Sequence, residues 1–171
     1  MRVFVTVIFS ILFTGCCIKF SDQTTGTNFN VGAVITSCDT EIMVEQFQWG
    51  NGTWTSSGNA RIDDRNYAKG SGNDLNARNV NLNFQYDHPL DKITFKFGEL
   101  GGNINIKING DFQNIADLIS LNGNSIGNTQ VTINANQVGN NWYGEARLEG
   151  AINEFVIGGQ ELWLDNICPC N

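Results

Sequence analysis

Residues 80–110 read VNLNFQYDHPLDKITFKFGELGGNINIKING, and this stretch decides the fold class. Apolar and polar side chains alternate through three successive runs, which are separated by His88-Pro89 and by Gly101-Gly102-Asn103. A period of two is typical of β-strands that bury one face and expose the other. Turn-forming residues between such runs favour antiparallel pairing.

The same pattern continues toward the C-terminus. Residues 131–135 alternate again, and further turn signals occur at 109–111, 122–124, 139–141 and 158–160. Short strands at this spacing predict an all-β protein, an antiparallel β-sandwich of jelly-roll type. Only Asn114–Leu121 shows helical spacing, so we expect at most one short helix.

Length and composition agree with one such domain. The chain has 171 residues, with 19 Gly and 24 Asn, two residue types that are poor in helix interiors. Its net charge of −7 argues against binding a nucleic acid backbone, which requires clustered Lys and Arg. Asn recurs on the polar faces of the predicted strands, where amides suit hydroxyl-rich ligands, packing between copies, or solubility alone.

The N-terminus has the pattern of a secretion signal. Met1-Arg2 precedes the apolar run Val3–Phe13, which is too short to span a bilayer as a helix. The next residues, through Thr14-Gly15-Cys16, resemble the lipobox of bacterial lipoproteins, in which the peptide is cut before a cysteine that is then acylated. The alternative is an ordinary signal peptide with Cys16 and Cys17 as thiols.

This resemblance implies a division of the chain. Residues 1–15 would be the lipoprotein signal peptide, and acylated Cys16 would anchor the protein in a lipid bilayer. The location would be extracytoplasmic, at the bacterial outer membrane or cell surface. Residues 16–32, rich in Thr, Asn, Ser and Gly, are predicted to be a flexible tether, and 33–171 the sandwich.

Five cysteines in a short chain favour an oxidising compartment. Cys38 precedes the first predicted strand, whereas Cys168 and Cys170 follow the last one. First and last strands commonly lie close in a sandwich, so we predict a disulfide from Cys38 to Cys168 or to Cys170. Cys17 is left unassigned, and Cys168-Pro-Cys170 lacks the spacing of a zinc site.

The segment Glu161–Ile167, ELWLDNI, resembles the closing strand of secreted jelly-roll modules of the galactose-binding-like type. Many such modules bind carbohydrate, and in some an Asp of this strand helps to hold a structural calcium ion. The longer pattern from Gly101 to Cys168 is also similar to a recurring secreted bacterial domain. The resemblance implies a sandwich and a carbohydrate ligand.

Two aromatic turns are the candidate ligand contacts. Trp54 follows the turn that contains Asn51, and Trp142 follows Asn141. Sugar binding requires flat aromatic faces for stacking and amides for the hydroxyl groups. We therefore predict that these four residues contact a polysaccharide or other glycan. The alternative is that the rings cap the ends of the core.

Four carboxylates are candidate ligands for calcium, which prefers oxygen. Asp63, Asp64 and Asp74 lie in one turn-rich region, and the galactose-binding-like resemblance adds Asp165. The alternative is that these are solvated turn carboxylates. Calcium is the only cofactor expected.

Catalysis is not expected. Glu161 and Asp165 share one strand face but lie about 13 Å apart at about 3.3 Å per residue, beyond the spacing of glycosidase carboxylates. The chain contains no Gly-x-Ser-x-Gly motif to partner His88. We therefore expect a non-catalytic, surface-anchored carbohydrate-binding lipoprotein. The alternative is a structural or adhesive surface protein.

Overall fold

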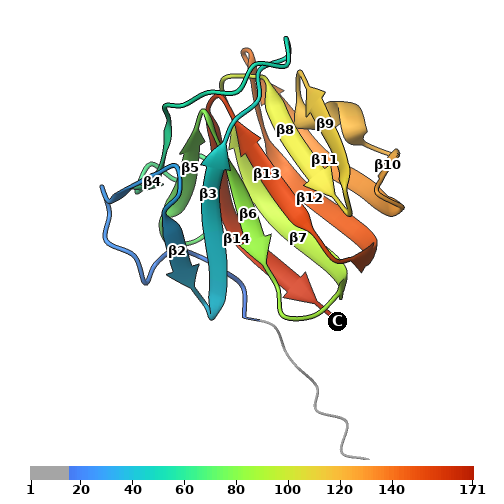
Figure 1. Ribbon diagram of the computed structural model, residues 1–171, viewed down its shortest axis with the longest axis horizontal. Helices are drawn as coiled ribbons and strands as arrows, with labels where there is room; N and C mark the ends of the chain where they lie inside the picture. The colour runs from blue at the N-terminus through green and yellow to red at the C-terminus, as the bar shows by residue number, and fades with distance from the viewer. Residues whose placement is uncertain (1–15) are drawn as a thin grey trace, which may run out of the picture.

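The computed structural model describes residues 16–171, so the predicted signal peptide 1–15 lies outside the described residues. Two antiparallel sheets pack face to face (Figure 1). The eight-stranded sheet comprises, in spatial order, β1 (Asn28–Asn30), β4 (Asn59–Asp63), β5 (Asp74–Arg78), β14 (Leu162–Cys170), β7 (Leu90–Glu99), β12 (Asn141–Ile152), β11 (Thr129–Val138) and β10 (Ser125–Ile126). The six-stranded sheet comprises β2 (Val34–Ser37), β3 (Thr40–Gln46), β6 (Val80–Gln85), β13 (Phe155–Gly159), β8 (Ile104–Ile108) and β9 (Asp111–Ile115).

The predicted all-β antiparallel sandwich is therefore confirmed. Its one helical turn within residues 16–171 is the 3₁₀ helix η1 (Leu118–Leu121), which lies inside the segment Asn114–Leu121 that has helical spacing. In that part of the chain, none of the helices has the length and apolar character needed to cross a membrane.

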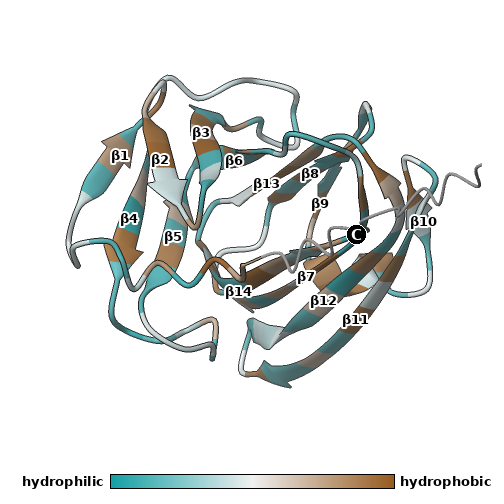
Figure 2. Cartoon of the chain, turned by 90° about the horizontal axis from the view of Figure 1, so that it is seen from below, coloured by the Kyte–Doolittle hydropathy of each residue, from teal (hydrophilic) through white to brown (hydrophobic). Residues whose placement is uncertain are grey.

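The alternation seen in the sequence sets the register of the six-stranded sheet. Ile157 of β13 lies opposite Leu82 of β6 on one side and opposite Ile106 of β8 on the other. All three side chains are buried. Because successive side chains of a strand point to opposite faces, hydropathy alternates along strands with one exposed face, such as β11 (Figure 2). The first three residues of β13 and of β14 are instead continuously apolar and buried.

Aromatic rings join the two sheets across the core. The ring centroid of Phe155 in β13 lies 5.7 Å from that of Phe95 in β7, and 5.3 Å from that of Phe84 in β6. Phe155 is fully buried, so its ring contacts both layers at once.

Residues 16–32 differ from the expected tether, because they pack on the sandwich. Ile18 and Phe20 are fully buried. Ile18 exchanges two backbone hydrogen bonds with Ile167, of 2.8 and 3.0 Å, and β1 pairs with β4. The composition of residues 16–32 is mostly polar, but Ile18 and Phe20 in this segment are buried against the sandwich.

The disulfide pairing also differs from the prediction. Cys17 is bonded to Cys168, and Cys38 to Cys16, whereas Cys170 is a free thiol. The reason lies in the preceding contact: because Ile18 pairs with Ile167, the chain places Cys17 beside Cys168, with their Cα atoms 4.2 Å apart. Cys38 and Cys168 are therefore each bridged to the N-terminal segment, not to each other.

Candidate functional site

Trp54 is presented by a tight turn between β3 and β4, as the sequence suggested. The Trp49 amide donates to the Thr53 carbonyl and the Gly52 amide to the Trp49 carbonyl, both at 2.8 Å. The Asn51 carboxamide oxygen accepts from the Thr53 amide (3.0 Å) and hydroxyl (2.7 Å). Asn51 thus shapes the turn through its side-chain oxygen, and Trp54 is 54% exposed.

A hollow of about 270 Å³ lies beside Trp54, lined by Trp54, Glu45 and Gln46. The amide of Asn83 donates to the Glu45 carboxylate at 2.7 Å, which holds that carboxylate in place. The ring of Phe112, from β9, lies 6.2 Å from that of Trp54. We call these residues, Glu45, Gln46, Trp54 and Phe112, the Trp54 site.

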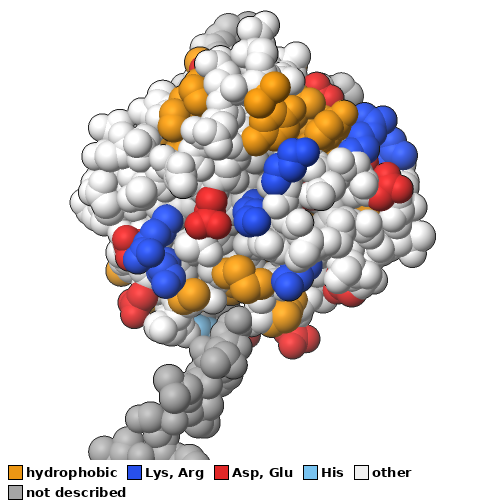
Figure 3. All heavy atoms as spheres, turned by 180° about the vertical axis from the view of Figure 1, so that it is seen from behind, with side chains coloured by type: hydrophobic (Ala, Val, Ile, Leu, Met, Phe, Trp, Pro, Cys, Tyr) orange, Lys and Arg blue, Asp and Glu red, His pale blue; other side chains and the backbone are white. Residues whose placement is uncertain are grey.

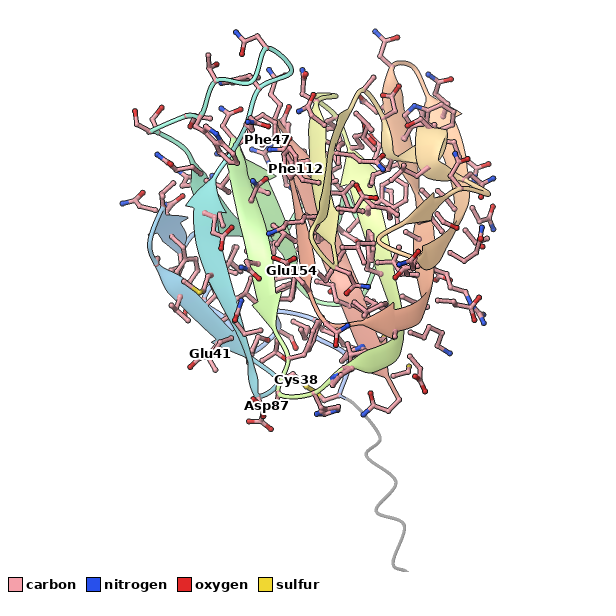
Figure 4. All side chains as sticks on the ribbon, turned by 45° about the vertical axis from the view of Figure 1, so that its right-hand side comes forward. Cys38, Glu41, Phe47, Asp87, Phe112 and Glu154 are labelled. Atoms are coloured by element: carbon pink, nitrogen blue, oxygen red, sulfur yellow. A yellow bond between two sulfur atoms is a disulfide. The ribbon has the colours of Figure 1, made fainter. Side chains whose placement is uncertain are left out.

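The Trp54 site lies over the outer face of the six-stranded sheet. In Figure 4, Phe112 and Phe47 lie toward one end of the sandwich, whereas Cys38 and Asp87 lie at the other. Phe47 is fully buried and packs edge-to-face on Trp49, with ring centroids 5.2 Å apart. This contact joins the turn to a buried ring outside the core between the sheets, whereas Trp54 remains exposed.

Amide side chains fasten the same turn to the sheet. Asn81 donates to the Gln46 carbonyl (2.8 Å), and Asn114 donates to the Gln48 carbonyl (3.0 Å) and to Asn105 (2.7 Å). Asn81 and Asn105 are buried beneath the turn. Asn81 and Asn105, which the sequence predicts on exposed polar strand faces, are instead buried and support the Trp54 site together with Asn114.

The second predicted pair is placed differently. Trp142 lies within β12 opposite Gln137, and its half-buried ring packs against the hydrophobic core. Asn141 is the first residue of that strand, opposite Val138. Trp142 therefore belongs to the eight-stranded sheet and caps the core, so it does not share a surface with Trp54.

Three of the four predicted calcium ligands lie in a row across neighbouring strands. Asp63 of β4 is opposite Asp74 of β5, and the pairing of Leu164 with Leu75 brings Asp165 of β14 to the other side of Asp74. All three carboxylates are buried, whereas Asp64 is exposed. Like charges in directly opposed positions repel one another.

The row is covered by residues 64–73, the connection between β4 and β5, which we call the strap. Each carboxylate accepts a backbone N–H from it: Arg65 donates to Asp63 (3.0 Å), Ala68 to Asp74 (3.0 Å) and Ser71 to Asp165 (2.5 Å). Within residues 16–171, no group of three or more Asp, Glu, His or Cys side chains is arranged to hold a metal ion. Each of the three strand carboxylates binds a different part of the strap. The four residues predicted to bind calcium therefore do not form one cluster.

Burial changes the acidity of this row. Desolvation raises the pKa of Asp165 to about 6, although backbone N–H donors act in the opposite direction. Burial likewise raises the pKa of Asp74, and the nearby charge of Asp63 adds to that rise. Asp165 is therefore partly protonated near pH 6.

Glu99 is a second buried carboxyl group, at the end of β7. It accepts the Leu118 N–H at 2.9 Å, which ties η1 to the eight-stranded sheet. Burial raises the pKa of Glu99 to about 8, and the neighbouring Asp117 carboxylate contributes to the rise. At neutral pH the group is mostly uncharged.

Of the residues in the Trp54 site, the sequence predicted only the tryptophan. Alternation along β3 places Glu45 on the outer face, so its position could have been predicted from the sequence. Phe112 comes from a distant strand, and nothing in its local sequence indicates the contact. No protein-family model, curated protein or solved structure matches this chain.

Proposed function

We propose that this protein is a non-catalytic carbohydrate-binding module whose Trp54 stacks on a sugar ring. The supporting observation is an exposed indole beside the fixed carboxylate of Glu45 in one hollow. An aromatic face packs on the C–H surface of a pyranose, and a carboxylate accepts hydrogen bonds from its hydroxyl groups. Gln46 adds an amide that both donates and accepts.

A polysaccharide affinity-electrophoresis screen with a panel of neutral glucans, xylans and mannans tests this function. The expected result is retardation of the wild type by at least one polymer, its loss in Trp54→Ala, and its partial retention in Trp54→Phe. Met43→Ala is the matched control, because Met43 is also exposed on the outer face of the six-stranded sheet. Equal mobility of the wild type and Trp54→Ala in every polymer would contradict the proposal.

We further propose that the module is held at a membrane by acylation of Cys16. A cysteine sulfur that carries a diacylglyceryl group is a thioether, so it cannot also form the Cys16–Cys38 disulfide. Intact mass and detergent-phase partitioning of the mature protein distinguish the two states. Acylation predicts a lipid mass increment and an alkylatable Cys38, whereas a Cys16–Cys38 bridge in the mature protein would overturn it.

A second candidate function, a structural or adhesive protein, is favoured by one observation. Val34 and Met43 lie opposite each other on the outer face of the six-stranded sheet, and they are 47% and 40% exposed. Two adjacent exposed apolar side chains suit contact between copies. Sedimentation velocity over a concentration series would show self-association that Met43→Lys abolishes, and a monomer at all concentrations would contradict this candidate.

A further inference from the structure

A groove of about 510 Å³ crosses the outer face of the eight-stranded sheet, on the opposite side of the sandwich from Trp54. The strap forms one wall through Lys69, and β11 forms the other through Asn136 and Val138. Lys96 of β7 and Tyr143 of β12 lie between these walls. Figure 3 shows this face, on which basic, acidic and apolar side chains lie near one another.

Two ammonium groups, those of Lys69 and Lys96, lie in the groove near carboxylates with which they form no direct ion pair. Glu145 of β12 and Asp165 of β14 lie opposite Lys96, and Asp74 interacts electrostatically with Lys69. Lys69 and Lys96 belong to none of the ion pairs found within residues 16–171. The Lys96 ammonium donates to the Lys69 carbonyl at 3.1 Å, and the Lys69 ammonium lies 5.7 Å from the centroid of the Tyr143 ring. In a chain of net charge −7, the two Lys side chains of the groove outnumber its one carboxylate, Glu145, so the lining carries a local excess of positive charge.

The remaining lining limits the kind of anion. Tyr143 is half-buried and Val138 is 64% exposed, so together they offer an apolar surface. Asn136 and Glu145 are exposed polar groups that can hydrogen-bond hydroxyls. Glu145 of β12 lies directly opposite Lys96 of β7. The negative charge of Glu145 disfavours the binding of a densely charged polyphosphate.

We propose that this groove binds a carboxylated sugar, such as a uronate unit of an acidic polysaccharide. The uronate carboxylate binds between Lys69 and Lys96, its ring packs on Tyr143, and its hydroxyls face Asn136 and Glu145. The strap is fixed by three buried carboxylates, so Lys69 is positioned before the ligand arrives. This site lies on the other sheet from the Trp54 site and does not depend on the proposed function.

Isothermal titration calorimetry with trigalacturonate, at low ionic strength, tests the groove directly. The fully methyl-esterified trisaccharide is the ligand control, because it keeps the sugar rings and loses the charge. Lys92→Gln is the protein control: Lys92 lies on the same strand as Lys96, four residues away, and does not line the groove. Thermal unfolding verifies that each variant is folded.

The wild type is expected to bind the acid at least tenfold more tightly than the ester. The double variant Lys69→Gln/Lys96→Gln should lose at least tenfold in affinity, whereas Lys92→Gln and Trp54→Ala should bind like the wild type. Absence of binding by the wild type, equal affinity for acid and ester, or an equal loss in Lys92→Gln would each overturn the proposal. Loss of binding in Trp54→Ala alone would assign the acid to the Trp54 site and overturn it as well.

Discussion

Gly98 of β7 lies directly against the backbone carbonyl of Tyr67 in the strap. A Cβ atom at Gly98 would collide with that carbonyl oxygen and would lie 2.8 Å from the carbonyl carbon. The Tyr67 ring packs edge-to-face on Trp163 of β14, with centroids 4.9 Å apart. The bare backbone at Gly98 therefore lets the strap lie flat against the sheet.

Gly98→Ala should push the strap away and destabilise the protein by about 1–3 kcal/mol, as overpacking does in a tight interior. Urea unfolding of the variant measures this loss. Thr94→Ala, a half-buried position on the same face of β7, is the control and should change stability little. Gly98→Ala at wild-type stability would show that the strap is not closely seated.

The Cys17–Cys168 disulfide should contribute strongly to stability, because it closes a loop with a sequence separation of 151 residues. Replacing both cysteines by serine is expected to cost about 2–5 kcal/mol in the free energy of unfolding. Cys170→Ser removes the free thiol and should leave stability unchanged. Denaturant unfolding of both variants makes the comparison, and a double variant as stable as Cys170→Ser would contradict the prediction.

Glu99 should make stability depend on pH. Its pKa is about 8 in the folded protein and near 4.5 when unfolded, so the folded state retains a proton that the unfolded state has lost between these values. The contribution of Glu99 to stability is therefore full below pH 4.5 and declines up to about pH 8. Glu99→Gln keeps an oxygen for the Leu118 N–H and cannot titrate.

Melting temperatures at pH 5, 6, 7 and 8 check this expectation. The difference between Glu99→Gln and the wild type should grow in favour of the variant as the pH rises. A difference that is constant over the series would mean that Glu99 ionises normally in the folded protein.

Asp165 should also make the protein less stable as the pH rises, over a lower pH range than Glu99. With its pKa raised to about 6 from 3.8, it contributes most to stability below pH 3.8 and loses that contribution by about pH 6. The charged groups facing it are Asp74 and Lys19. Asp165→Asn can still accept the Ser71 N–H, and it should flatten the stability profile between pH 4 and 6 while leaving the profile from pH 7 to 8 unaltered. Stability profiles of the wild type and Asp165→Asn that run parallel from pH 4 to 8 would contradict this prediction.

The core can be tested at the ring that joins the sheets. Phe155→Ala should cost about 3–5 kcal/mol, because it removes contacts with Phe95 and Phe84 and leaves a cavity. Val34→Ala, at a position 47% exposed, should cost far less. Similar losses in the two variants would mean that Phe155 is not central to the core.

The fold could be predicted from the sequence because its signal is local. The alternation of Leu82 and Phe84 with Asn81 and Asn83 requires only neighbouring residues, and the sandwich follows from it. The same reasoning predicted the turn that presents Trp54. Alternation also places Trp142 on the core face once its strand is extended back from Leu148, although its neighbouring turn residues suggested a loop.

The cysteine pairing and the Trp54 site required distant contacts. Cys17 meets Cys168 because two buried isoleucines pair across nearly the whole chain, a relationship that composition does not express. Phe112 reaches Trp54 only through the order of strands in the six-stranded sheet. Both depend on topology, which local patterns leave open.

The attachment of the N-terminal segment has a mechanical consequence. A pulling force applied at Cys17 passes through its disulfide to Cys168 into β14, an interior strand that is hydrogen-bonded to β5 and to β7. The hydrogen bonds on both sides of β14 must then shear together, whereas an edge strand such as β1 can be unzipped one bond at a time. With the Cys17–Cys168 disulfide intact, the domain should therefore require a high force to unfold. After reduction of this disulfide, unfolding should begin at an edge strand and require less force.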